Sequence, residues 1–185
     1  MQDNQDKKLF LLDAYALIFR SYYAFIRNPR LTSKGLNTSA IFGFLLTLEE
    51  VLQKQRPTHI AVVFDVSGPT FRHEMYKEYK ANRDETPEDI KTAVPYIKRL
   101  IEAYRIPVID YPGFEADDVI GTLAKKASAR GFTTYMMTPD KDFAQLVSGN
   151  IFMYKPSRSG NESVIWGIED IKREFEVERP EQVID

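Results

Sequence analysis

Seven carboxylates follow segments that have the composition of buried strands. The strand-like segments cover residues 8–12, 59–64, 106–109 and 132–137, and a helical segment opens soon after the third. The acids that follow them are Asp13, Asp65, Glu115, Asp117, Asp118, Asp140 and Asp142. Because parallel strands end at one edge of a sheet, where α/β folds build their binding crevices, we expect these side chains to gather there.

Carboxylates gathered at one edge raise one another's pKa and oppose folding unless a cation compensates their charge. Oxygen ligands of this kind select Mg²⁺, Mn²⁺ or Ca²⁺ over zinc and copper. Two such ions about 3.5–4 Å apart activate water and stabilise the leaving oxygen of a phosphodiester. Taken singly, each acid also has an ordinary structural explanation, such as complementing a helix dipole or capping a helix. Their expected convergence favours a metal-dependent hydrolase.

The composition is that of a folded globular protein. The chain has 185 residues, of which 43% are hydrophobic and 28% charged, and this length allows one domain with a substantial core. No apolar run reaches the roughly 18–20 residues of a membrane span, and the polar N-terminus lacks a secretory signal. Cysteine is absent and only two histidines occur, which excludes disulfides and argues against a zinc site. We therefore predict a cytoplasmic protein without a membrane partner.

The net charge of −2 hides a segregation of charge along the chain. Without the seven acids, the remaining residues carry a net charge of +5, so the average does not exclude a nucleic-acid partner. Residues 71–85 are rich in Lys, Arg and Tyr, which suit phosphate contacts and stacking on bases. A solvated amphipathic helix would have the same composition. The candidate DNA-contacting residues are Arg72, Lys77, Tyr79, Lys80 and Arg83, with Arg20 in a weaker second cluster.

Strand-like and helical segments alternate along the chain. A fifth strand-like run covers residues 150–154. Helical patterns cover residues 38–55, 86–104, 115–130 and 167–175. Runs of apolar residues without strict alternation indicate strands buried on both faces, so we predict a three-layer α/β fold with a mostly parallel central sheet. We also expect a kink or break at Pro95, a polar loop at residues 28–37, and the start of a further helix at residues 179–185.

Five motifs together resemble a known family. They are residues 10–13 (FLLD), 62–65 (VVFD), 71–83 (FRHEMYKEYKANR), 113–118 (GFEADD) and 138–142 (TPDKD). In this order they resemble the N-terminal 5′–3′ exonuclease domain of bacterial DNA polymerase I, a member of the flap endonuclease group. The resemblance covers nearly the whole chain and implies a PIN-like α/β fold with a helical arch.

The resemblance implies a role for each matching residue. It places Asp13, Asp65, Glu115 and Asp117 at a first metal site with Asp118 beside them, and Asp140 and Asp142 at a second. Lys80 and Arg83 match basic residues of the arch that engage the scissile phosphate and the 5′ strand. The implied cofactors are two Mg²⁺ or Mn²⁺ ions, and these nine residues are the catalytic candidates.

The activity implied by the resemblance is 5′–3′ exonuclease and flap endonuclease cleavage in replication and repair. The implied partners are DNA with a 5′ flap, nick or 5′ end, RNA/DNA primer junctions, and a polymerase module on the same full-length chain. We expect a monomer in which residues 1–185 form the nuclease core. We expect the chain to stop before the family's last acidic motif and its helix–hairpin–helix-like element, which would leave the second metal site incomplete.

Two other functions are compatible with part of the pattern. A phosphotransfer domain also places an aspartate after a strand, but the common aspartyl phosphohydrolases carry a second aspartate two residues later. Tyr15 and Ser67 occupy those positions here. A catalytically weak or inactive DNA-binding module, with structural acids, is the second alternative.

Overall fold

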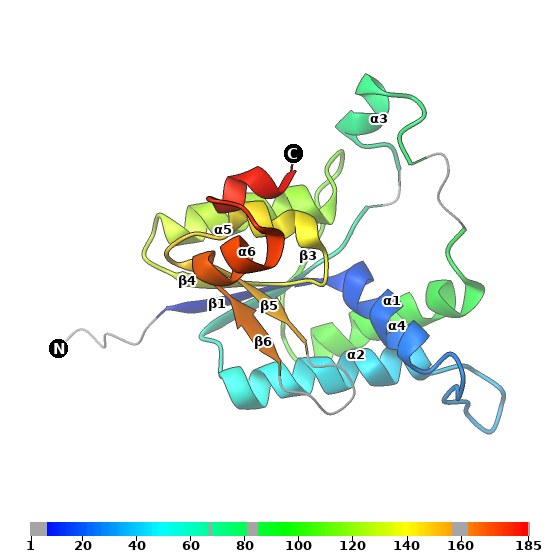
Figure 1. Ribbon diagram of the computed structural model, residues 1–185. Helices are drawn as coiled ribbons and strands as arrows, with labels where there is room; N and C mark the ends of the chain where they lie inside the picture. The colour runs from blue at the N-terminus through cyan, green and yellow to red at the C-terminus, as the bar shows by residue number, and fades with distance from the viewer. Residues whose placement is uncertain (1–6, 67, 81–84, 157–162, 185) are drawn as a thin grey trace.

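A six-stranded sheet forms the centre of the computed structural model, which describes residues 7–66, 68–80, 85–156 and 163–184. The strands lie in the order β3-β2-β1-β4-β5-β6 (Figure 1). They are β1 (Lys8–Asp13), β2 (His59–Val63), β3 (Val108–Ile109), β4 (Thr133–Met137), β5 (Ile151–Lys155) and β6 (Val164–Trp166). The first five are parallel to their neighbours and β6 is antiparallel to β5. The predicted mostly parallel sheet is confirmed, whereas β6 had no counterpart in the sequence analysis.

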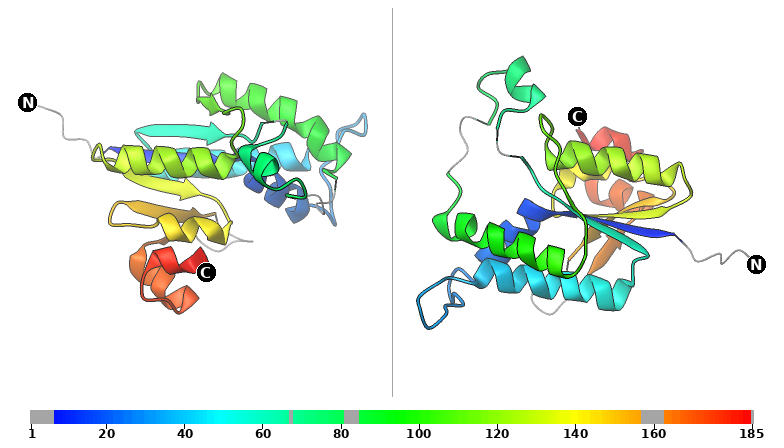
Figure 2. Two further views of the ribbon diagram at one scale, coloured as in Figure 1. Left: turned by 90° about the horizontal axis from the view of Figure 1, so that it is seen from above. Right: turned by 180° about the vertical axis from the view of Figure 1, so that it is seen from behind.

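Helices cover both faces of the sheet, which confirms the three-layer prediction (Figure 2). One face carries α1 (Ala14–Ala24), α2 (Ser39–Glu50) and α4 (Glu88–Ala103). The other carries α5 (Ala116–Ser128), α6 (Ile168–Phe175) and the 3₁₀-helical segment η2 (Lys141–Leu146). The π-helical turn η1 (Val51–Gln55) extends α2, the short helix α3 (Phe71–Met75) follows β2, and the 3₁₀ turn η3 (Pro180–Ile184) ends the described chain.

The two faces explain why the strands read as continuous apolar runs. In β1, Phe10 and Leu12 pack into the core beneath α1, α2 and α4, while Leu11 packs into the core beneath α5. Phe10, Leu11 and Leu12 are all at most 1% exposed. Side chains alternate across a strand, so a strand covered on both sides needs apolar residues at every position. Parallel pairing of β1 with β2 and β4 brings the carboxyl ends of these three strands together at one edge.

Several local predictions have different outcomes. The four predicted helices form, and residues 28–37 form a loop closed by a bridge between Leu31 and Asn37. Of the kink or break predicted at Pro95, the break is wrong, because α4 continues through this residue. Pro95 lies on the exposed side of α4, where water can satisfy the carbonyl that loses its partner. In the described part of the predicted arch, the only helix is the five-residue α3.

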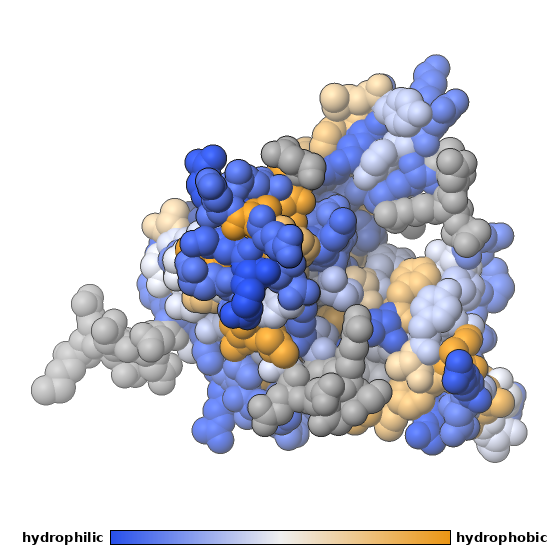
Figure 3. Space-filling model, viewed as in Figure 1, coloured by the Kyte–Doolittle hydropathy of each residue, from blue (hydrophilic) through white to orange (hydrophobic). Residues whose placement is uncertain are grey.

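The surface is mostly hydrophilic on the face shown in Figure 3, with apolar side chains gathered over α1 and the loop after it. Tyr23 of α1, and Ile26 and Leu31 of the loop after it, are each more than half exposed. Among the described helices, none combines the length and the hydropathy that a membrane crossing requires.

Close packing of α1 against α2 depends on a glycine. A Cβ atom added to Gly43 in α2 would lie 2.7 Å from Cβ and 3.2 Å from Cα of Ser21 in α1. Ser21 is buried, and its Cβ and Cα are fixed by the helix backbone, so they cannot turn away like the end of a long side chain. The two helices can therefore approach this closely only because position 43 lacks a side chain.

We expect Gly43→Ala to lower the free energy of unfolding by about 1–3 kcal/mol, the usual cost of overpacking, despite the higher helix propensity of alanine. Urea unfolding followed by circular dichroism measures the change. Gly149→Ala is the matched control, because a Cβ at Gly149 meets no atom within 4 Å. Equal stability of the two variants would show that α1 and α2 have room to separate.

Candidate functional site

A cavity of about 270 Å³ opens at the carboxyl edge of the sheet. Five of the seven predicted acids line it, namely Asp13, Asp65, Glu115, Asp117 and Asp140. They come from the ends of β1, β2 and β4 and from the start of α5. Tyr15, Lys80 and Phe143 also line the wall. The predicted convergence at one edge is therefore observed for these five residues.

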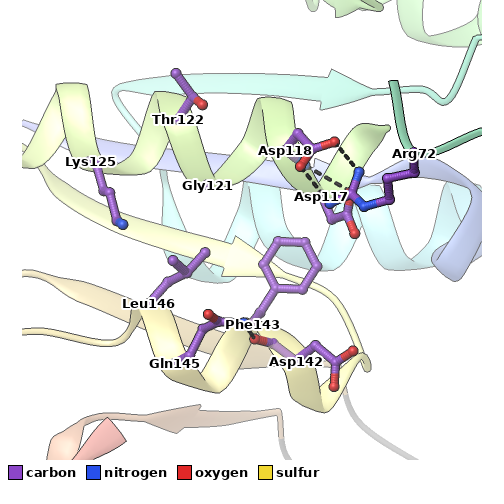
Figure 4. Close-up of a pocket in the computed structure, with 10 residues that line it drawn as sticks. All are labelled: Arg72, Asp117, Asp118, Gly121, Thr122, Lys125, Asp142, Phe143, Gln145 and Leu146. Atoms are coloured by element: carbon purple, nitrogen blue, oxygen red, sulfur yellow. Dashed lines mark hydrogen bonds and ion pairs between the residues drawn. The ribbon is translucent and has the colours of Figure 1, made fainter. Parts of the chain in front are cut away.

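The remaining two acids line a neighbouring cavity of about 310 Å³ (Figure 4). Asp118 of α5 and Asp142 of η2 are among the residues that line it, and the Asp118 carboxylate points towards Arg72. Asp117 and Phe143 line both cavities, so the two spaces adjoin. Five acids thus line one cavity and three line the other, and Asp117 belongs to both.

Asp13 is the most enclosed aspartate of the site, at 9% exposed. It ends β1 and caps α1, because its Oδ1 accepts a hydrogen bond from the backbone N of Ala16 at 3.1 Å. Its Oδ2 accepts one from Oγ1 of Thr138 at 3.0 Å. Burial raises the pKa of Asp13 to about 6, with smaller contributions from the charges of Asp65 and Asp140, although the two hydrogen bonds oppose the shift. A buried carboxyl group with a raised pKa lacks a compensating positive charge.

The start of α5 is fixed to the edge of the sheet by a second carboxylate. Oδ1 of Asp65 accepts a hydrogen bond from the backbone N of Ala116 at 2.8 Å. Glu115 caps α5, and its own backbone N donates to Oδ2 of Asp118 at 3.1 Å. Asp117 follows in the first turn, where burial and the charge of Asp118 raise its pKa. Hydrogen bonding to helix N-termini thus orients acids that repel one another.

Two basic side chains reach the acids from the segment after β2. Nζ of Lys80 donates to Oε2 of Glu115 at 2.7 Å, and the hydroxyl of Tyr79 donates to the same oxygen at 3.2 Å. The guanidinium of Arg72 donates to both carboxylate oxygens of Asp118, at 2.5 and 2.8 Å. This paired bond lowers the pKa of Asp118 and raises that of Arg72. The positive charges of Lys80 and Arg72 therefore compensate part of the negative charge of Glu115 and Asp118.

The chemistry of the donor set fits divalent cations with hard oxygen ligands. The candidate ligands are all carboxylates, and a cavity lies between them. Lys80 and Arg72 already bring positive charge to Glu115 and Asp118, while the raised pKa values of Asp13 and Asp117 indicate that charge is still uncompensated there. Within the described segments, no three His, Cys, Asp or Glu side chains are arranged closely enough to form a ready-made metal site.

The candidate DNA-contacting residues lie in different surroundings in the structure. Arg72, Tyr79 and Lys80 are turned towards the acids, as described above. Arg20 donates from Nη2 to the backbone O of Pro156 at 3.3 Å. Lys77 is exposed. Arg83 lies outside the described residues.

Two residues of the site were not among the candidate site residues of the sequence analysis. Thr138 is fully buried, and its hydroxyl donates a hydrogen bond to Asp13. Tyr15 lines the cavity that contains five carboxylates. A buried hydroxyl directly after β4, beside the predicted acids, is the signal that identifies Thr138. Tyr15 follows Asp13 by two residues, but nothing in the sequence alone distinguishes a tyrosine of the site from one of the core.

Comparison with known proteins agrees with this geometry. A family model described as 5′–3′ exonuclease, N-terminal resolvase-like domain, matches residues 8–176. The chain belongs to this family. The resemblance found in the sequence motifs is thereby confirmed, and the exonuclease-family fold accounts for the sheet and its carboxyl edge.

Several relatives of this chain are longer than the chain itself. A 5′–3′ exonuclease of Aquifex aeolicus is 42% identical over 150 residues, which is 81% of this chain and 51% of the relative. A DNA polymerase I of Synechocystis is 46% identical over 143 residues, which is 76% of this chain and 14% of the relative. The chain thus spans about half of the first and a small part of the second.

The same fold occurs in solved structures. A flap endonuclease of bacteriophage T5, crystallised as a pseudo-enzyme–product complex with DNA and metal ions, superposes with a TM-score of 0.70. The match covers 96% of this chain and 64% of the T5 protein at 20% sequence identity. At this identity the similarity establishes the fold and confirms the predicted PIN-like class.

We expect Asp13→Asn to stabilise the metal-free protein above about pH 6. The folded pKa of Asp13, about 6, exceeds its ordinary value of 3.8. The stabilisation that comes from keeping the Asp13 carboxyl group neutral is therefore fully present below pH 3.8. It is lost as the pH rises through 6. Asparagine stays neutral and keeps an oxygen for Ala16, so the gain at pH 8 is about 1–3 kcal/mol.

Chemical unfolding in EDTA between pH 4 and 8 measures this gain, which should shrink towards pH 4. Asp110→Asn is the control, because Asp110 follows β3 at the same edge but lies outside both cavities. A loss of stability in Asp13→Asn at pH 8 would show that the buried charge is already compensated.

Proposed function

We propose that the chain is a metal-dependent 5′–3′ exonuclease and structure-specific flap endonuclease that hydrolyses phosphodiester bonds of DNA and RNA primers. The observation that carries this proposal is the cavity lined by five carboxylates, with Lys80 extending to Glu115 from the segment after β2. Membership of the exonuclease family and the metal-bound DNA complex of the T5 relative support it. DNA with a 5′ flap, nick or 5′ end is the proposed substrate.

In this proposal the carboxylates hold two Mg²⁺ or Mn²⁺ ions. The first would be held by Asp13, Asp65, Glu115 and Asp117, with Asp118 beside them, and the second by Asp140 and Asp142. When bound, such ions lower the pKa of water and neutralise charge that develops on a phosphodiester. The separation of Asp142 from the five-carboxylate cavity is consistent with a second site that is less complete than the first.

The positively charged side chains of Lys80 and Arg72 would also take part in the proposed reaction. Lys80 and Arg72 bind carboxylates in the free protein, and both are partly exposed, so their side chains can turn towards a substrate. An ammonium or guanidinium group that leaves its carboxylate can donate to a non-bridging phosphate oxygen and stabilise charge there. Tyr79 donates to Glu115 and would keep that carboxylate oriented after Lys80 has moved.

The relatives named DNA polymerase I suggest the biological setting. We propose that a polymerase module lies on the same full-length chain, that residues 1–185 supply the nuclease core, and that the protein acts as a monomer. A DNA-binding module without cleavage is the alternative function. The gathering of five acids with two raised pKa values favours the nuclease, because acids repel the DNA phosphates unless cations join them.

We expect Asp65→Asn to reduce cleavage of a 5′-flap substrate in Mg²⁺ or Mn²⁺ on the order of 100-fold. Asparagine preserves an acceptor for the backbone N of Ala116, so the loss reflects charge at the site rather than unfolding. Gel analysis of the cleaved flap provides the measurement, with circular dichroism to verify the fold. Asp110→Asn, from the same edge of the sheet, should cleave normally.

EDTA should abolish wild-type cleavage. Full activity of Asp65→Asn, or wild-type cleavage that persists in EDTA, would contradict the assigned site. Binding of the flap in Ca²⁺ without cleavage in Mg²⁺ or Mn²⁺ would instead support the DNA-binding alternative.

We expect Lys80→Met to separate metal binding from cleavage. Removing the ammonium group from Glu115 should strengthen Mn²⁺ binding, about two- to tenfold for one cation near a partly buried carboxylate, while cleavage falls because a phosphate contact is lost. Calorimetric titration with Mn²⁺ and the flap assay measure the two effects. Lys91→Met, which removes an ion-paired lysine from α4, is the control, and parallel losses of binding and cleavage would argue against competition at Glu115.

A further inference from the structure

A third cavity, of about 430 Å³, lies between the turn that precedes α5 and the outer side of that helix. Its wall is largely apolar, with Asp118, Thr122 and Lys126 as polar members. Tyr111 and Phe114 contribute its aromatic surface, together with Ile109 and Leu123. We call this cavity the aromatic groove. Apart from Asp118, none of these residues has a task in the proposed hydrolysis.

The aromatic side chains of the groove are arranged before any ligand arrives. The ring centroids of Tyr111 and Phe114 are 5.5 Å apart, and those of Phe114 and Phe71 are 5.6 Å apart. Tyr111 is 59% exposed and Phe114 is 42% exposed. Large apolar side chains with this exposure, gathered on one turn, mark an interaction site more often than a random surface.

The turn that carries these rings is held by its backbone. The N of Phe71 donates to the O of Gly113 at 3.0 Å, and the N of Phe114 donates to the O of Tyr111 at 3.2 Å. Gly113 has a φ of +84°, which residues with a side chain rarely adopt. A ligand that stacks on Tyr111 therefore meets a surface that is already in place.

The groove adjoins the acidic site along α5. Asp118 and Thr122 line both the groove and the cavity that contains Arg72, which in turn shares Asp117 with the five-carboxylate cavity. Lys125 and Lys126 are exposed on the same helix. A strand of DNA leaving the acids would thus pass basic side chains that suit its phosphates before it reaches aromatic side chains that suit its bases.

We propose that the aromatic groove binds an unpaired base of the DNA strand whose phosphodiester is cleaved, with the base stacked on Tyr111. This inference rests on the proposed nuclease function and identifies where the unpaired part of its substrate lies. A nucleotide fits better than an apolar peptide, because the groove combines aromatic rings with nearby lysines and is joined to the proposed phosphodiester site. Stacking of this kind accepts any base, so the groove would favour unpaired DNA without selecting a sequence.

The test uses 5′-flap DNA with 2-aminopurine at each of the first four unpaired positions, bound to the 185-residue chain in Ca²⁺. Stacking on Tyr111 quenches the fluorescence of 2-aminopurine at one or two of these positions. Tyr111→Ala should remove this quenching and raise the Kd of the flap about 5- to 20-fold, the effect of losing one base–aromatic stack. Tyr111→Phe should restore both, because the ring remains.

Three comparisons make the result specific to unpaired DNA and to this groove. Tyr111→Ala should bind a nicked duplex without a flap as tightly as the wild type does. Tyr96→Ala, which removes a tyrosine that is 46% exposed on α4 and outside the groove, should leave quenching and affinity unchanged. An abasic residue at the quenched position should weaken wild-type binding but not Tyr111→Ala binding.

The groove proposal is overturned if no position is quenched in the wild type, or if Tyr111→Ala weakens flap and nicked DNA equally. Failure of the nuclease proposal has a different signature, namely Tyr111-dependent quenching in Ca²⁺ without cleavage in Mg²⁺ or Mn²⁺. A chain that binds none of these DNAs overturns both.

Discussion

Repulsion among carboxylates at one edge of the sheet is the constraint on which the rest of this structure depends. Parallel strands bring Asp13, Asp65 and Asp140 to the same edge, and burial makes the charge of Asp13 costly. Such a group folds only if donors or cations meet each acid. The fold supplies the backbone N of Ala16 and of Ala116, but it leaves part of the negative charge without compensation.

The acids of the site also determine how the chain turns from strand to helix. Asp13 caps α1, Glu115 caps α5 and Asp140 caps η2. Each cap uses the orphan N–H groups of a helix start, which carry partial positive charge. The local structure therefore needs acceptors at the positions where the proposed chemistry needs ligands. Replacing one of these acids with an apolar residue would remove both the helix cap and the proposed ligand. Substitution by the corresponding amide, which keeps an oxygen, is therefore the informative change.

Sequence patterns anticipated the parts of the molecule that are governed by local rules. The apolar runs of β1, β2, β4 and β5 identified the buried strands, and the acids after them predicted the edge of the sheet. The three residues of β6 carry too little local signal, because this strand exists through its pairing with β5. Helix α1 was missed because its aromatic and apolar residues occur on more than one side, which obscures a single amphipathic stripe.

Within the site, the residue types were predictable but the pairings were not. Arg72, Lys77, Lys80 and Arg83 belong to one basic segment and read alike in the sequence. Only three-dimensional structure brings Arg72 to Asp118 and Lys80 to Glu115, since each pair is separated by at least 35 residues of chain. The division of seven acids between two cavities likewise depends on the side-chain directions of α5 and η2.

The two ion pairs give the free protein a state in which negative charge is partly compensated by its own side chains. Lys80 and Arg72 both come from the segment after β2, so the same contacts that satisfy the acids also hold this segment over the site. A divalent ion that took over Glu115 or Asp118 would remove a reason for the segment to stay there. Metal binding and rearrangement of the segment would then be linked, because a ligand shifts an equilibrium only through its different affinities for the two states. Substrate phosphates would complete the exchange, since they offer the released cations new acceptors at the point where the phosphodiester meets the acids.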